Sequence, residues 1–387
     1  MLTRAHRSIA YPVWYRTAQV PEALIAQQPA VPRDSSRLMV VRRATGEVEH
    51  RVFRELPDVL AAEARATGRR FAMVANNSKV VDCLLDVVCA GGKRHVVYLL
   101  EKVGECRWLA SGETLAEIAS AGGPFTPEGG VSGLRGEMHV PRADGLADCH
   151  FELLASDEGS ASSVSSAAAV DAAVSKLLRV PLPPYVRSRE GEAQYDTVYA
   201  KAEGSVAAPT AGLHFTERVL ERLKNECDVP RAEVTLHVGY GTFAHIESDA
   251  LKDHAMHPER VSVSTETAEA ITSFSRDGRE LLAVGTTATR TLESLAKGSA
   301  SDGDLTFDKC EGSADLFIWP GGHTWRAVGA LLTNFHMPGL TPVCLVASFM
   351  GAKSSPQEGY ELCLKAYRTA VQEKYRFYSF GDSMLVL

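Results

Sequence analysis

The chain has 387 residues, 45% hydrophobic and 23% charged, which is typical of a globular protein of one or two domains. No apolar run approaches the roughly 20 residues of a membrane-spanning helix, and the eight cysteines form no C-x-x-C pair. Neither a zinc cage nor a disulfide framework is indicated, so we expect reduced thiols and a cytoplasmic location. The net charge of −7 argues against nucleic-acid binding over the whole surface.

The charge is unevenly distributed along the chain. The first 70 residues contain 12 arginines and no lysine against 7 acidic residues. Such a basic end suits a local contact with phosphates, and it is equally typical of a solvated arginine face. Arg4, Arg7 and Arg16, with no acidic residue among the first 20, are also compatible with a targeting segment over residues 1–12.

Residues 1–82 have the pattern of an α/β domain. Apolar segments at 38–41 and 48–52 flank a Thr-Gly turn, which predicts a β-hairpin. A helix is expected over 56–66, followed by a buried strand at 71–74.

The pattern changes after residue 82. From 83 to 155, short strands alternate with glycine-rich turns, which predicts a small inserted β-barrel domain. Residues 156–175 are almost entirely Ser, Ala, Asp, Glu, Gly and Val, and we predict a flexible connection there. Residues 176–387 return to alternating strands and helices, so they complete a discontinuous main domain with 1–82.

The elements expected in the second part of the main domain alternate in type. Strands are predicted at 232–238, 281–284, 316–319, 343–349 and 376–380, and helices at 215–224, from Ser264 as N-cap, at 289–296 and at 357–374. This order predicts a largely parallel sheet with helices on both faces.

Three predicted strands run directly into polar, glycine-containing turns. These turns are 239–242, 285–290 and 381–383. Ligands of α/β sheets bind beyond the carboxyl ends of strands, near helix N-termini, so the turns suit a ribose, a carboxylate or a phosphate. None has the spacing of a Walker loop or a Rossmann fingerprint, and glycine at a strand end also serves as an ordinary turn.

Histidines are concentrated between 206 and 257, which contains five of the 12. His254 and His257 have a spacing that metal ligands use, but no H-E-x-x-H motif accompanies them. A proton-handling pair and a structural pair remain open beside the metal interpretation. No G-x-S-x-G motif is present, which argues against a serine hydrolase.

Several ordered motifs give the chain a family resemblance. They are LIAQ at 24–27, PRDSSRL at 32–38, APTAGLHFT at 208–216, TLHVGYGTF at 235–243, HAMH at 254–257, VGTTATRTLES at 284–294, DLFI at 315–318, LLTNFHMP at 331–338 and YRFYSFGD at 375–382. The chain thereby resembles the S-adenosylmethionine:tRNA ribosyltransferase-isomerases of queuosine biosynthesis.

The resemblance implies an α/β main domain with an inserted β-barrel, as the pattern also predicts. It implies transfer of the ribosyl part of S-adenosylmethionine onto 7-aminomethyl-7-deazaguanine in a tRNA anticodon loop. Epoxyqueuosine forms, and adenine and methionine leave. No cofactor is implied, because S-adenosylmethionine is consumed as a substrate, and we expect a monomer that contacts no membrane.

Residue roles follow from the same resemblance. Proton transfers would fall to histidines and a carboxylate, first His254 and His257, then His214, His336 and Asp382. The sulfonium substrate would be held by Pro209, Thr210, Gly212, Gly239, Gly241, Thr242, Thr286, Thr287, Arg290 and Asn334. The tRNA phosphates would meet Arg33 and Arg37, and no metal is expected.

The chain departs from the usual family pattern at four positions. Asn77 replaces an acid, Leu84 and Gln194 replace arginines, and Leu340 replaces a serine. These changes leave open a relative that binds S-adenosylmethionine or RNA without catalysis, or one with an altered substrate. A metal-dependent hydrolase built on the histidine cluster is a third hypothesis.

Overall fold

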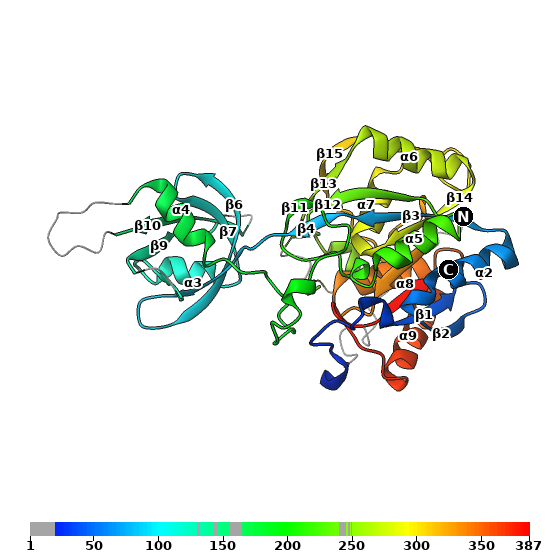
Figure 1. Ribbon diagram of the computed structural model, residues 1–387, viewed down its shortest axis with the longest axis horizontal. Coiled ribbons are helices and arrows are strands. Elements are labelled where there is room, and N and C mark those ends of the chain that lie inside the picture. The colour runs from blue at the N-terminus through cyan, green and yellow to red at the C-terminus, as the bar shows by residue number, and fades with distance from the viewer. Residues whose placement is uncertain are drawn as a thin grey trace, which may run out of the picture. The chain divides into compact units, whose positions relative to one another are not determined.

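The structure is a computed structural model that describes residues 20–129, 132–142, 145–154, 165–239, 245–246, 248 and 250–387. The chain forms two compact units, the first made of Met1–Lys79 and Leu182–Leu387 and the second of Val80–Pro181 (Figure 1). Residues 80–82 and 176–181, which we assigned to the main domain, belong to the second unit.

The first unit is built on a nine-stranded sheet. In spatial order its strands are β15 (Cys310–Ala314), β13 (Glu259–Val263), β12 (Arg231–Leu236), β3 (Arg70–Asn76), β14 (Arg279–Val284), β16 (Val328–Asn334), β17 (Ser383–Val386), β1 (Arg37–Arg42) and β2 (Glu47–Val52). β4 (Ser78–Val80) and β11 (Ala202–Ser205) form a separate two-stranded sheet.

The nine-stranded sheet is mixed. Among the described strands, the pairs β12–β3, β3–β14, β14–β16 and β1–β17 are parallel. The other four neighbouring pairs are antiparallel. The prediction of a largely parallel sheet is therefore not confirmed: parallel pairing joins β12, β3, β14 and β16 at the centre and β17 to β1 nearer the edge, and the remaining pairs are antiparallel. The β1–β2 pair is antiparallel because a short turn returns the chain directly.

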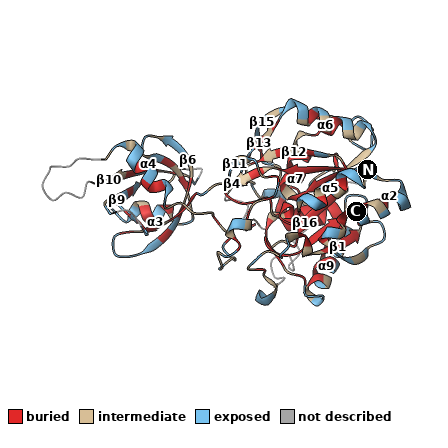
Figure 2. Ribbon diagram, in the orientation of Figure 1, coloured by how far each residue is buried: buried red, intermediate tan, exposed pale blue. Residues whose placement is uncertain are grey.

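Helices cover both faces of this sheet. One core contains residues of α6 (Thr265–Arg276), α7 (Gly285–Leu295), α8 (Thr341–Met350) and α9 (Pro356–Gln372). The other contains residues of α2 (Leu56–Thr67) and α5 (Glu217–Asn225). Successive residues of β14 enter opposite cores, Leu281 the first and Leu282 the second. The central strands are accordingly buried on both sides (Figure 2).

Local sequence explains where several of these elements begin. Ser264 caps α6 as predicted, because its side chain accepts a hydrogen bond from the Thr267 backbone N–H. Thr216 caps α5 in the same way through Val219. Short 3-10 turns precede or connect the longer elements: η1 (Glu22–Leu24), η2 (Arg33–Ser35), η3 (Phe53–Glu55), η4 (Glu192–Gln194), η5 (Thr210–Gly212) and η7 (Leu251–Asp253).

Three strand predictions are wrong. Residues 343–349, predicted as a strand, lie in α8, where every residue from Pro342 to Met350 is buried. A helix that is apolar on all sides shows no 3.6-residue period, so periodicity cannot separate it from a buried strand. Residues 316–319 and 376–380 form no strand, and the nearby strands β15 and β17 lie a few residues away from them.

The second unit is a barrel-like antiparallel sheet. Its strands are β8 (Thr126–Pro127), β5 (Leu84–Val88), β6 (Arg94–Gly104), β7 (Arg107–Ser111), β10 (Ala147–Leu153) and β9 (Leu134–Met138), in spatial order. Phe125, next to β8, exchanges two backbone hydrogen bonds with Gly136 of β9, so the first and last strands meet. The helix α3 (Leu115–Ser120) contributes to the same core.

The segment predicted as a flexible connection contains a helix. Within 156–175 the structure describes residues from 165 onward, and α4 (Ala167–Ser175) begins there at Ser166, whose side chain caps it. Val170, Ala173 and Val174 are buried in the core of the second unit. A low-complexity composition therefore concealed an amphipathic alanine-rich helix. In the described part of the chain, no helix is both long and apolar enough to cross a membrane.

Candidate functional site

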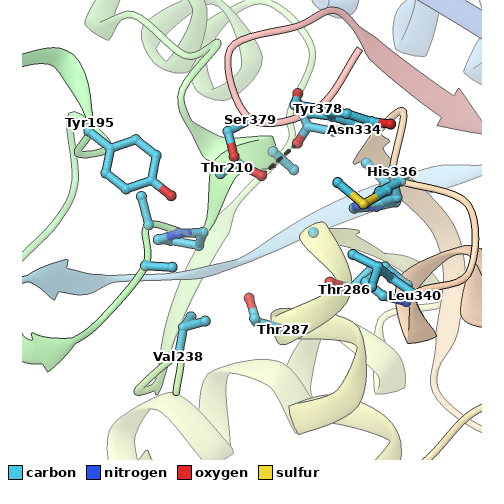
Figure 3. Close-up of a pocket in the computed structure, with 18 of the residues that line it drawn as sticks. Tyr195, Thr210, Val238, Thr286, Thr287, Asn334, His336, Leu340, Tyr378 and Ser379 are labelled. Atoms are coloured by element: carbon cyan, nitrogen blue, oxygen red, sulfur yellow. Dashed lines mark hydrogen bonds between the residues drawn. The ribbon is translucent and has the colours of Figure 1, made fainter. Parts of the chain in front are cut away.

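A pocket opens in the first unit at the carboxyl ends of β12, β14 and β16 (Figure 3). These strands lie in the parallel centre of the sheet, so their carboxyl ends share one edge. The pocket contains about 680 Å³ of empty space, part of which is open to solvent. Its walls come from residues 207–211, 285–287, 333–334, 336–337 and 378–379, with Tyr185, Tyr195, Val238, Leu340 and Pro342.

A buried hydrogen-bond network lies behind the 207–211 wall. The Thr210 hydroxyl donates to Asn334 Oδ1 over 3.0 Å. Asn334 Nδ2 lies 3.5 Å from the backbone oxygen of Tyr378 and 3.1 Å from His214 Nε2. Since a backbone carbonyl can only accept, the nitrogen of the Asn334 amide must face Tyr378 and His214. His214 Nε2 is then the acceptor.

The network fixes the tautomer of His214. Because Nε2 accepts, the proton of the neutral ring lies on Nδ1, which faces Ser36 Oγ at 2.8 Å. The ring also stacks on Phe53, with 5.1 Å between centroids. Burial, with smaller effects of the charges of Arg376 and Arg33, lowers the pKa of His214 to about 3. His214 is therefore neutral at physiological pH, and it positions Asn334 and Thr210.

His336 is the imidazole that lines the described pocket wall (Figure 3). Its Nε2 lies 2.7 Å from the Thr333 hydroxyl, and its backbone N–H donates to the Tyr367 hydroxyl over 3.0 Å. Burial lowers the pKa of His336 to about 4. The ring is consequently neutral at neutral pH, so one of its two nitrogens carries no proton and can accept one.

The N-terminus of α7 forms the floor opposite this network. Gly285, the first residue of the helix, has a φ of +86°. A residue with a side chain would be strained in this backbone conformation. Thr286 and Thr287 follow in the pocket wall, and no side chain caps the helix at Val284. Asn76 Nδ2 donates to the Thr287 hydroxyl over 3.2 Å. Helix N-termini of this kind suit the carboxylate of a ligand.

Arg290, predicted as a substrate contact, is committed to the protein. Its guanidinium forms an ion pair with Glu259 and donates to the backbone oxygens of Leu316 (3.0 Å) and Ala314 (3.1 Å). Arg290 and Glu259 are 8% and 5% exposed, so each charge depends on the other. The other carboxylate oxygen of Glu259 accepts a hydrogen bond from the Gly239 backbone N–H over 3.0 Å. Gly239, also predicted as a substrate contact, therefore has its N–H bonded within the protein.

The histidine pair that we favoured for catalysis lies elsewhere in the first unit. His254 and His257 are absent from the described pocket wall. His254 packs edge-on against Phe317, with 4.9 Å between ring centroids, and its pKa is lowered by burial and by His257. His257 is exposed. Across the described ranges, no cluster of three or more His, Cys, Asp or Glu side chains is arranged to hold a metal ion.

Two further candidates, Asp382 and Gly212, have structural positions. Asp382 is buried, and its carboxylate accepts the backbone N–H groups of Arg37 (2.9 Å) and Arg376 (2.8 Å). It thereby holds the turn that presents Tyr378 and Ser379 to the pocket. Gly212 packs so closely on Tyr199 that an added Cβ would lie 2.3 Å from its hydroxyl. Gly241 and Thr242 lie outside the described residues.

The arginines predicted to contact tRNA both have partners in the protein. Arg33 is half-buried, and its Nη1 donates to the backbone oxygen of Asp196 over 2.9 Å. Arg37 stacks on Tyr375 at 3.7 Å and donates to the backbone oxygen of Glu373 over 2.6 Å. Each guanidinium has five N–H donors, so these contacts leave further donors for a phosphate.

The sequence analysis missed part of the pocket wall. Five of the residues that we predicted as substrate contacts line the pocket: Pro209, Thr210, Thr286, Thr287 and Asn334. The missed aromatic residues are Tyr185, Tyr195 and Tyr378. Tyr185 and Tyr195 lie in irregular segments, and Tyr378 lies in 376–380, which we predicted as a strand. Leu340, which we noted only as a departure from the family pattern, also lines the pocket.

The fold and the pocket define a protein of the α/β class with a largely uncharged small-molecule pocket. Residues 17–386 match the model of a family described as queuosine biosynthesis protein. The chain belongs to this family.

Relatives of the chain carry a more specific name. The S-adenosylmethionine:tRNA ribosyltransferase-isomerase of Rubrobacter xylanophilus is 40% identical over 371 residues, which are 95% of this chain and 96% of that protein. The enzyme of the same name from Desulfitobacterium hafniense is 39% identical over 374 residues, 95% and 98% of the two chains. A crystal structure of S-adenosylmethionine tRNA ribosyltransferase from Thermotoga maritima covers 98% of this chain and 100% of that chain at 27% identity, with a TM-score of 0.48.

Proposed function

We propose that this chain is an S-adenosylmethionine:tRNA ribosyltransferase-isomerase. It moves the ribosyl part of S-adenosylmethionine onto 7-aminomethyl-7-deazaguanine in a tRNA anticodon loop. Epoxyqueuosine, adenine and methionine are the products, and S-adenosylmethionine is consumed rather than serving as a methyl donor. Relatives of that name at about 40% identity over 95% of the chain support the proposal.

The observation that carries the proposal is the convergence of separate motifs on one pocket. The APTAGLHFT, VGTTATRTLES, LLTNFHMP and YRFYSFGD motifs are far apart in the sequence, and each contributes residues to the pocket wall. A structural role for each motif would not require them to meet around one empty space. A shared small-molecule substrate explains their meeting.

The pocket has an arrangement suited to S-adenosylmethionine. The N-terminus of α7 is placed to hold the methionine carboxylate, because its backbone N–H groups and dipole favour negative charge. Val238, Met337, Leu340 and Pro342 supply apolar wall for the less polar parts of the substrate. Tyr185 and Tyr378 lie with their ring centroids 4.7 Å apart, and their faces can attract the sulfonium.

His336 is the residue to which we assign proton transfer. A C–H bond beside a sulfonium is acidified, so a positioned base can take its proton and leave the electron pair on carbon. The unprotonated His336 ring can accept that proton. The resulting imidazolium is acidic enough to return it to a nitrogen of the departing adenine. We therefore place His336 ahead of His254 and His257 in the proton-transfer steps.

The nucleic-acid contact falls to the basic N-terminal part of the chain. We assign Arg33 and Arg37 to tRNA phosphates, because both lie at the basic N-terminal part of the chain and retain unused donors. The anticodon loop is proposed as the tRNA element, with a monomer as the acting form. A cytoplasmic location agrees with a tRNA substrate.

Adenine release tests the function. Purified protein is incubated with S-adenosylmethionine and with tRNA that carries either the 7-aminomethyl-7-deazaguanine precursor or unmodified guanine. We expect free adenine only with the precursor tRNA, unaffected by a chelator. Binding of S-adenosylmethionine without adenine release would indicate a non-catalytic relative, and chelator-sensitive hydrolysis would indicate a metal-dependent hydrolase.

Paired histidine variants test the assigned proton transfer. His336→Gln should reduce adenine release by about 10²–10⁴-fold, the usual contribution of general acid–base catalysis. His257→Gln is the matched control, because this exposed side chain lies outside the described pocket wall. Loss of release in His257→Gln, with His336→Gln unchanged, would reverse the assignment.

A further inference from the structure

The Tyr195 hydroxyl is a buried polar group that the proposed reaction has not used. Tyr195 is 2% exposed and lines the pocket, with its ring edge-on to Phe380 at 5.6 Å. Buried hydroxyls nearly always have a hydrogen-bond partner. Among the described residues, the Tyr195 hydroxyl has none with hydrogen-bond geometry, although Ser379 and the Ala208 backbone lie near enough to influence its pKa.

The Tyr195 hydroxyl is available as a donor. Burial raises its pKa above the ordinary tyrosine value, and the opposing effect of Ser379 is smaller. The phenol therefore keeps its proton at any physiological pH. In Figure 3 the hydroxyl points into the pocket, toward the side where Thr210 and Ser379 lie.

Thr210, in the same part of the pocket, has the opposite polarity. Its only hydrogen is directed to Asn334 Oδ1, because the Asn334 nitrogen is committed to Tyr378 and His214. The Thr210 oxygen can then offer only lone pairs to a ligand. The pocket thus presents one fixed donor, at Tyr195, and one fixed acceptor, at Thr210.

We propose that Tyr195 and Thr210 form a donor–acceptor pair that recognises the vicinal hydroxyls of a ribose. This inference rests on the proposed function and assigns a part of the substrate to a part of the pocket. A hydroxyl group both donates and accepts, so a diol satisfies both partners at once. A carboxylate would face the lone pairs of Thr210, and an ammonium group would leave the Tyr195 donor unsatisfied. The fit therefore favours a neutral group that both donates and accepts, and the ribose diol of the proposed substrate is such a group.

A second tyrosine provides a matched control. Tyr199 is 4% exposed, and its hydroxyl also has no partner among the described residues. It packs against Gly212 and Phe215 and does not belong to the described pocket wall. Tyr195→Phe and Tyr199→Phe remove the same atom from similar burial, and only the first change should reach the ligand.

The test is calorimetric titration with S-adenosylmethionine and its 2′-deoxy and 3′-deoxy ribose analogues, without tRNA. Tyr195→Phe should weaken binding of S-adenosylmethionine about 5- to 20-fold, and Tyr199→Phe less than about twofold. The wild type should bind both deoxy analogues more weakly. For the Tyr195→Phe variant, one of the two deoxy analogues should bind as tightly as S-adenosylmethionine. That analogue lacks the ribose hydroxyl that Tyr195 contacts in the wild type, so the variant has no contact left to lose there.

The same titration separates this inference from the proposed function. Thr286→Phe places a bulky ring in the half-buried position at the α7 N-terminus and should abolish binding. If Thr286→Phe blocks binding while Tyr195→Phe binds all three ligands like the wild type, the diol assignment is overturned and the pocket assignment stands. If Thr286→Phe binds like the wild type, or the wild type does not bind, the pocket assignment is overturned together with this inference.

Discussion

The neutrality of buried His214 makes the first unit sensitive to acid. In the unfolded chain, a histidine takes up a proton below about pH 6.5, whereas in the folded protein His214 does so only near pH 3. The unfolded state therefore binds more protons between these values, and the free energy of unfolding falls as the pH falls through this window. The full contribution of His214 to stability is present above about pH 6.5.

The size of the effect follows from the two pKa values. Between pH 7 and pH 5, His214 alone should lower the free energy of unfolding by about 2 kcal/mol. The folded ring stays neutral over this range, so the loss is determined by protonation of the unfolded chain. His336 acts in the same direction, since its pKa is lowered to about 4.

Substitution isolates the part due to His214. His214→Gln removes the titrating ring and should be less stable than the wild type at pH 7, because it loses the stack on Phe53. Between pH 7 and pH 5, however, it should lose about 2 kcal/mol less than the wild type. His257→Gln, at an exposed position, should lose as much as the wild type.

Amide hydrogen exchange supplies the measurement. The exchange rates of the backbone amides of β1 and β16, measured along a urea gradient, report the free energy of unfolding of the first unit separately from that of the second unit. Equal losses between pH 7 and pH 5 in the wild type and in His214→Gln would refute a neutral, buried His214.

Substitutions at three other positions are expected to change the stability of the first unit, measured by the same exchange experiment. Leu340→Ser should cost about 1–3 kcal/mol, because lost apolar burial exceeds the gain from a new N-cap of α8, and Leu340→Ala should cost about 1 kcal/mol more; equal losses would mean that no cap forms. Arg290→Gln should cost about 3–5 kcal/mol by leaving Glu259 buried without its partner; weaker S-adenosylmethionine binding at unchanged stability would instead make Arg290 a substrate contact. Asp382→Asn should cost about 1–3 kcal/mol by losing one of two accepted backbone hydrogen bonds, and an equally stable variant would contradict that role.

Much of the fold could be predicted because its signals are local. Short stretches of sequence determine the β1–β2 hairpin, the capped start of α6 and the amphipathic helix α9, because their residue patterns lie within the elements themselves. The helix α8 could not be recognised, since its complete burial removes the periodicity on which the prediction depends. The mixed pairing of the sheet depends on long-range contacts, which strand patterns do not encode.

The site could be predicted only in part, for a different physical reason. Thr210, Thr286 and His336 stand in motifs, and the strand ends bring them together. Arg290 and Asp382 stand in similar motifs, but both are buried and their charged groups bind partners within the protein. A sequence does not show which way a polar side chain points, so structural and substrate-contacting residues look alike. Tyr195 was missed because its segment has no regular pattern around it.

A crystal structure of the complex with S-adenosylmethionine tests most directly whether this pocket is the substrate site. We expect the carboxylate at the N-terminus of α7, beside Thr286, and the ribose between Tyr195 and Thr210, with His336 against the sulfonium end. Substrate bound instead beside His254 and His257, with the pocket empty, would contradict the site, the assigned base and the diol recognition together.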